Sequence, residues 1–115
     1  MNVTLPWPLK ELSPNKRFHW ARVAKAKKQY REACFYLAKE AKLSAPEEGD
    51  IMVELTFYPP CKRNRDRDNL LAAMKSGLDG LADAMNVNDR RFVPIVRLKD
   101  EIGGMVKVRI YGGDA

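Results

Sequence analysis

Residues 51–85, IMVELTFYPPCKRNRDRDNLLAAMKSGLDGLADAM, contain the pattern that decides the fold. Within residues 51–57 an apolar side chain occupies every second position, which predicts a β-strand with one buried face. Pro59 and Pro60 end this strand, because proline cannot donate a hydrogen bond to a neighbouring strand. The charged residues 62–68 then follow as an extended loop at the end of a strand.

The second half of this stretch predicts a helix. Asp68 or Asn69 is a suitable N-cap, and the helix extends over Leu70–Met85. Small residues form a second stripe on it, at Ala73, Gly77, Gly80 and Ala84. This stripe permits the close approach of another backbone, although the two glycines can also be read as a sign of a weak helix.

Outside this stretch, the chain shows four further elements. Residues 3–7 alternate, with Pro6 and Pro8 limiting the pairing, and this predicts a short edge strand. Apolar residues at helical spacing predict a helix over Trp20–Lys42, and strands are expected at 93–98 and 105–111. The order β-α-β-α-β-β predicts an α+β fold. We expect a small mixed sheet of about four strands with two helices on one side, in a single domain spanning residues 1–115.

The composition favours a polyanionic partner. The chain has 115 residues and a net charge of +6, and residues 1–45 carry 10 Lys and Arg against 3 acidic residues. The single histidine makes a Cys/His zinc site unlikely on composition, and no apolar stretch is long enough to cross a membrane. Cys34 and Cys61 lie in different contexts, which predicts a reduced chain in the cytoplasm.

Asp66 and Asp68 can be read in two ways. In an extended segment, side chains at i and i+2 point the same way, so the two carboxylates would repel each other unless a cation such as Mg²⁺ lay between them. Lys62, Arg63, Arg65 and Arg67 around them suit a phosphate backbone. The alternative is a helix cap with surface salt bridges. The surrounding cations favour a metal-dependent phosphodiesterase that acts on nucleic acid.

Several other residues are candidates for binding metal or nucleic acid. Asp89, taken alone, is typical of an ordinary turn. Lys75 shares a helix face with Asp68, and it either pairs with Asp79 or neutralises charge on the scissile phosphate. His19 contacts a phosphate or base, or simply lies at the surface. Residues 15–20 mix cations with aromatics, which suits nucleic acid, although Phe18 and Trp20 can equally pack in the core. The predicted DNA-binding residues are Asn15, Lys16, Arg17, Lys62, Arg63, Arg65, Arg67 and Asn69.

These residues, in this order, resemble the RusA family of Holliday junction resolvases from phages and prophages. The match rests on residues 5–8 (LPWP), 12–15 (LSPN), 66–70 (DRDNL) and 78–81 (LDGL), followed by an acidic loop that ends in Asp89. It covers nearly the whole chain.

The resemblance implies a homodimer that binds four-way DNA junctions and makes symmetric paired nicks with Mg²⁺, or with Mn²⁺, in DNA recombination and repair. It implies that Asp66, Asp68 and Asp89 are catalytic and bind the metal. The family's lysine lies four residues after the second aspartate, where this chain has Ala72. Lys75 keeps the family's spacing to Asp79 and is its expected counterpart.

Asp89 presents a geometric problem. A straight helix over Leu70–Met85 would separate Asp68 from Asp89 by roughly 24 Å along its axis, too far for one metal site. Either the helix bends near Gly77 and Gly80 and the loop folds back, or Asp89 comes from a partner chain. The alternative functions are a non-catalytic DNA-binding module and a nuclease for forks, flaps or structured RNA.

Overall fold

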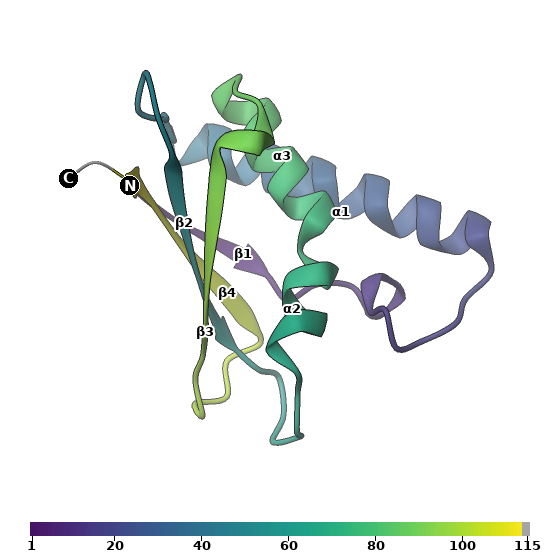
Figure 1. Ribbon diagram of the computed structural model, residues 1–115. Coiled ribbons are helices and arrows are strands. Elements are labelled where there is room, and N and C mark those ends of the chain that lie inside the picture. Colours follow the sequence, from purple (N-terminus) through teal and green to yellow (C-terminus); the bar gives the residue numbers. More distant parts are fainter. Residues whose placement is uncertain (114–115) are drawn as a thin grey trace.

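Four strands form one sheet in the computed structural model, which describes residues 1–113 (Figure 1). Three α-helices and two short 3-10 helices complete the single compact domain, and the fold is α+β as expected. The elements in chain order are β1 (Asn2–Pro6), η1 (Lys10–Leu12), α1 (Trp20–Glu40), β2 (Ile51–Tyr58), α2 (Arg67–Ala73), α3 (Lys75–Met85), η2 (Asp89–Arg91), β3 (Phe92–Leu98) and β4 (Met105–Gly112).

The sheet is mixed, with the strand order β1-β4-β2-β3. β4 is antiparallel to both β1 and β2, whereas β3 is parallel to β2, with Val53 opposite Pro94. Two adjacent parallel strands need a crossover connection, and α2 and α3 provide it. β1 lies at one edge of the sheet, as its prolines predicted, and β3 forms the other edge.

The connection from β3 to β4 passes across the end of β2. The backbone N–H of Lys99 donates to the Phe57 carbonyl over 3.0 Å, and that of Gly104 donates to the Tyr58 carbonyl over 2.8 Å. Gly104 has a φ of 71°, which a residue with a side chain adopts only at a cost. The two last strands therefore follow each other in sequence while β2 separates them in the sheet.

The core lies between one face of the sheet and the helices. Figure 1 shows α1, α2 and α3 on the same side of the sheet. The four alternating side chains of β2 point toward them and have no solvent exposure: Ile51, Val53, Leu55 and Phe57. On the opposite face of the sheet, Glu54 pairs with Arg97 over 3.1 Å.

The small-residue stripe of the second predicted helix packs against α1 of the same chain. A Cβ added to Gly80 would overlap the Arg31 carbonyl oxygen, and one added to Gly77 would lie 2.6 Å from the Tyr30 ring. The glycines therefore allow α1 and α3 to pack backbone to backbone. The reading of these glycines as marks of a weak helix finds no support in this packing.

Two helix boundaries differ from the sequence prediction. The helix expected over Leu70–Met85 begins three residues earlier, at Arg67, and is interrupted at Met74. Its N-cap is therefore Asp66, not Asp68 or Asn69. The first helix ends at Glu40, two residues before the predicted end, and Trp20 at its start is 76% exposed, so Trp20 does not pack in the core. No helix in the described part of the chain is long and apolar enough to span a membrane.

Candidate functional site

The interruption at Met74 is held by a tyrosine from α1. Met74 is fully buried between α2 and α3, and its φ and ψ of −86° and −5° depart from the helix. The Tyr30 hydroxyl contacts the Met74 sulfur at 3.3 Å and donates a hydrogen bond of 2.6 Å to the Pro6 carbonyl. Burial raises the pKa of Tyr30 far above its ordinary value, so the hydroxyl keeps its proton and remains a donor.

A sharp reversal after α3 determines where Asp89 lies. Asn86 adopts the left-handed conformation, with a φ of 54°, and the Val87 N–H donates to the Ala82 carbonyl over 3.0 Å. This is the hydrogen-bond pattern that commonly ends a helix. The Asn88 side chain then accepts from the Arg90 N–H at 2.9 Å and begins η2. Asp89, the first residue of η2, is thereby turned back along α3.

Asp68, Lys75 and Asp89 line one cavity of about 390 Å³, which we call the carboxylate cavity. It lies among α2, α3, η2 and β3, and its apolar walls include Leu71, Leu78, Phe92 and Pro94. The break that brings these residues together is at Met74, and not near Gly77 and Gly80 as the sequence suggested. Because the loop folds back, Asp89 lines the same cavity as Asp68 within one chain.

Asp79 is a fourth charged residue beside this cavity. Its position four residues after Lys75 predicted only a pairing role with that lysine. Asp79 and Asp89 line one hollow beside the end of α3. Burial raises the pKa of Asp79, and the neighbouring Asp89 raises it further, while Lys75 and Arg31 act in the opposite direction. Two carboxyl groups this close favour a shared proton or a bound cation. The two side chains are neighbours only because the chain folds back at η2, which the sequence did not reveal.

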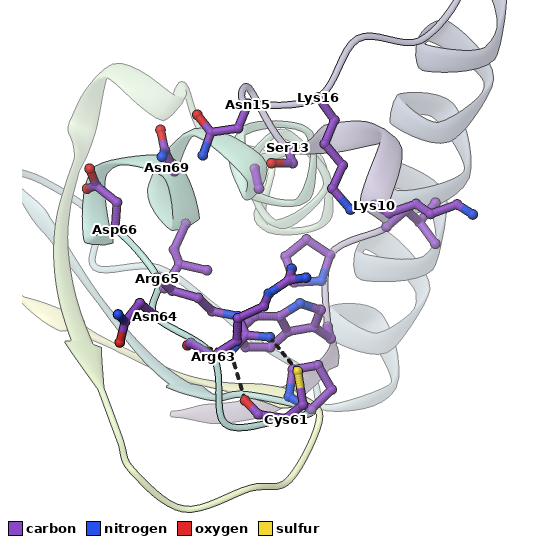
Figure 2. Close-up of a pocket in the computed structure, with 16 residues that line it drawn as sticks. Lys10, Ser13, Asn15, Lys16, Cys61, Arg63, Asn64, Arg65, Asp66 and Asn69 are labelled. Atoms are coloured by element: carbon purple, nitrogen blue, oxygen red, sulfur yellow. Dashed lines mark hydrogen bonds between the residues drawn. The ribbon is translucent and has the colours of Figure 1, made fainter.

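Asp66 does not face the same spot as Asp68. The premise of an extended segment is wrong, because Asp68 lies in the first turn of α2 and its N–H donates to the Asp66 carboxylate over 2.8 Å. Asp66 instead lines a larger cavity of about 760 Å³, which we call the loop cavity. Figure 2 shows its labelled side chains, which come from residues 10–16, residues 61–66 and Asn69.

The predicted DNA-binding residues divide into two groups. Five of them line the loop cavity: Asn15, Lys16, Arg63, Arg65 and Asn69. Arg17 and Arg67 are exposed and line neither cavity. Lys62 borders a further hollow, which shares Arg63 and Arg65 with the loop cavity. His19 is the N-cap of α1, and its Nδ1 accepts from the Ala21 N–H at 3.2 Å.

Arg65 holds the charged loop in place. Its guanidinium donates to the Cys61 carbonyl over 2.8 Å and to the Arg63 carbonyl over 3.1 Å, and it contacts the Cys61 sulfur at 3.2 Å. The same group lies over the Trp7 ring, 5.3 Å from its centre. Such a contact stabilises a cation on an aromatic face. Arg65 thus fastens residues 61–65 to the end of β1, while Arg63 remains exposed.

The acidic residues meet only part of what a metal site needs. Among residues 1–113, no group of three or more His, Cys, Asp or Glu side chains is arranged to hold a metal ion. The predicted set of Asp66, Asp68 and Asp89 is therefore not assembled. Mg²⁺ in proteins commonly keeps several waters and takes one or two carboxylates. The close pair of Asp79 and Asp89 fits that smaller requirement.

Replacing Asp79 with Asn should raise the stability of the fold at pH 7. A raised carboxyl pKa means that the folded chain binds this proton more tightly than the unfolded chain, whose value is near 3.8. The folded state therefore loses stability as the pH rises through the folded pKa. Thermal unfolding should show a gain below about 1 kcal/mol at pH 7, because solvent screens the pair, and no gain below pH 3.8.

A matched control for this prediction is Asp83→Asn. Asp83 lies one helical turn from Asp79 and pairs with Arg31 over 2.7 Å, so its loss should lower stability. Mg²⁺ should stabilise the original chain more than it stabilises the Asp79→Asn variant, since a cation bound to the folded state shifts the unfolding equilibrium. A variant that is less stable at pH 7, with the same Mg²⁺ response, would contradict the paired arrangement.

Comparison with known proteins gives a relative that is longer than this chain. No family model matches the chain. A protein of Xylella fastidiosa (strain Temecula1), described as an uncharacterized protein, is 45% identical over 116 residues, which cover 96% of this chain and 76% of the relative. Identity at this level over nearly the whole chain means a shared fold, and the chain belongs to the same family as this Xylella fastidiosa protein.

Proposed function

We propose that the chain is a metal-dependent endonuclease that resolves four-way DNA junctions, in DNA recombination and repair, as its resemblance to the RusA family implies. The observation that carries the proposal is the carboxylate cavity, which Asp68, Lys75 and Asp89 line together although 21 positions separate the first from the last in the sequence. The net charge of +6 supports a polyanionic substrate.

The residues around this cavity have distinct roles in the proposal. Asp79 and Asp89 would hold Mg²⁺ or Mn²⁺, and Asp68 lines the carboxylate cavity together with Asp89. The ion, when bound, activates water and stabilises negative charge on the phosphate. The Lys75 ammonium lies in the wall of that cavity and neutralises charge that develops on the scissile phosphate. Asp66 positions α2, since its carboxylate caps that helix.

The basic residues of the loop cavity hold the DNA backbone in this proposal. Lys16 and Arg63 present cations there, and Asn15 and Asn69 offer amide groups to phosphate or sugar oxygens. These groups recognise the shape and charge of the DNA, so junction choice arises from geometry. A homodimer belongs to the proposal as well, because symmetric paired nicks require two active sites.

A comparison of substrates tests the proposal. The protein is incubated with a four-way junction, a replication fork, a linear DNA duplex and an RNA hairpin, with Mg²⁺ or with a chelator. We expect paired nicks in the junction, no cleavage with the chelator, and a two-chain mass in sedimentation. Cleavage of only another substrate would replace the junction assignment. Junction binding without cleavage under either condition would make the chain a DNA-binding module instead.

A further inference from the structure

A third cavity lies next to the two already described. It has a volume of about 620 Å³ and lies among η1, α1 and the start of α3. It shares Lys75 with the carboxylate cavity and Lys16 with the loop cavity. The three hollows are therefore neighbours around α2 and the beginning of α3. We call this third hollow the lysine cavity.

The charge of the lysine cavity is strongly positive. Five cationic side chains line it: Lys16, Lys27, Lys28, Arg31 and Lys75. Of its two acidic side chains, Glu11 pairs with Arg22 over 2.9 Å, and Asp79 faces the positive charge of Lys75 and Arg31. Arg31 in turn pairs with Asp83. The lysines supply the positive charge that remains, and cations gathered in a hollow concentrate the potential that an anion meets.

A buried hydroxyl in the wall of this cavity points to a ligand. Ser76 is 8% exposed, and its Oγ has no hydrogen-bond partner among the described residues. Buried polar groups without partners are rare and each needs an explanation. Serine can rotate among staggered positions about χ1, and a phosphate oxygen in the cavity would supply the partner that this hydroxyl lacks.

We propose that the lysine cavity binds a phosphate of the nucleic-acid strand next to the scissile one, through Lys27, Lys28 and the Ser76 hydroxyl. This inference rests on the proposed function for its choice of nucleic acid as the ligand. The strand passes from the carboxylate cavity over Lys75 and between η1 and α1. The basic face of α1 thus has a specific role at two adjacent lysines, while Arg22 and Arg31 on the same helix serve the fold through ion pairs.

The salt dependence of binding tests the inference. The probe is a fluorescein-labelled four-way DNA junction, and its affinity is measured by anisotropy at several salt concentrations with a chelator present. Each phosphate contact contributes about 0.9 to the slope of log affinity against log salt. The double variant Lys27→Ala with Lys28→Ala should lower this slope by about 1, because the contact with one phosphate is lost. The control is Lys25→Ala with Lys39→Ala, which removes the same charge from α1 outside the cavity, and it should change the slope less.

A neutral substitution gives a second readout. Ser76→Ala should weaken binding by about tenfold, because a hydrogen bond to a charged group is lost. It should leave the salt slope unchanged, and it should not destabilise the fold, because the hydroxyl has no partner to lose. Equal slopes for the two lysine pairs, or an unchanged affinity for Ser76→Ala, would overturn the inference.

The two proposals can fail separately in these measurements. Binding with a chelator requires no cleavage, so a specific loss in the Lys27 and Lys28 variant supports the lysine cavity even in a protein that cuts nothing. Conversely, Mg²⁺-dependent cleavage of the junction together with equal slopes for both lysine pairs would leave the nuclease proposal standing and remove this site.

Discussion

Mixing Asp68→Asn chains with Asp89→Asn chains should restore no cleavage of a four-way junction. Each variant alone should lose about 10²- to 10³-fold or more in rate, as expected when a group that stabilises transition-state charge is removed. Both residues line the carboxylate cavity of a single chain. A mixed dimer would therefore contain two damaged sites, one from each variant, and no intact one.

The opposite result identifies a shared site. If Asp89 served the partner's Asp68, a mixed dimer would contain one site with both carboxylates intact, and cleavage of one strand would return. The control is a mixture of either variant with the original chain, which should nick one strand and so confirm that chains exchange. Both variants should still bind the junction in a gel-shift measurement, since the cationic residues are unchanged.

Replacing Gly80 with Ala should destabilise the fold by about 3 kcal/mol, at the upper end of the range for overpacking. In a helix interior this substitution ordinarily stabilises by about 1 kcal/mol, because alanine has the higher helix propensity. Here a Cβ would overlap the Arg31 carbonyl oxygen and lie 3.1 Å from the Phe35 backbone nitrogen. Backbone atoms in the middle of α1 cannot move aside as a side chain can, so α1 and α3 must separate.

Urea denaturation measures this effect against two other glycines. Gly77→Ala should cost less than Gly80→Ala, because its closest neighbour is the Tyr30 ring, which can shift. Gly112→Ala should change stability little, since its Cβ would meet only the Pro46 side chain at 3.4 Å. A Gly80→Ala variant as stable as the original chain would show that α1 and α3 do not pack this closely in solution.

Local patterns in the sequence correctly predicted several elements of the fold. The alternation in residues 51–57 predicted the buried face of β2, and Pro6 marked β1 as an edge strand. The start of α1 at Trp20 agrees with the approximate start that the helical spacing predicted. These features follow from side chains a few positions apart, so a single segment contains the information they need.

The assembly of the candidate site depends on contacts that the sequence did not reveal. α2 ends at Ala73, and Met74 separates it from α3. The Tyr30 hydroxyl, 44 residues away in the sequence, contacts the Met74 sulfur. No local signal marks this break. The helical first turn of α2 sends Asp66 and Asp68 to different cavities, and the left-handed Asn86 returns Asp89 toward Asp79. These placements depend on contacts between residues distant in sequence. The sequence therefore identified the candidate residues, whereas the packing of α1, α3 and the sheet places them in particular cavities.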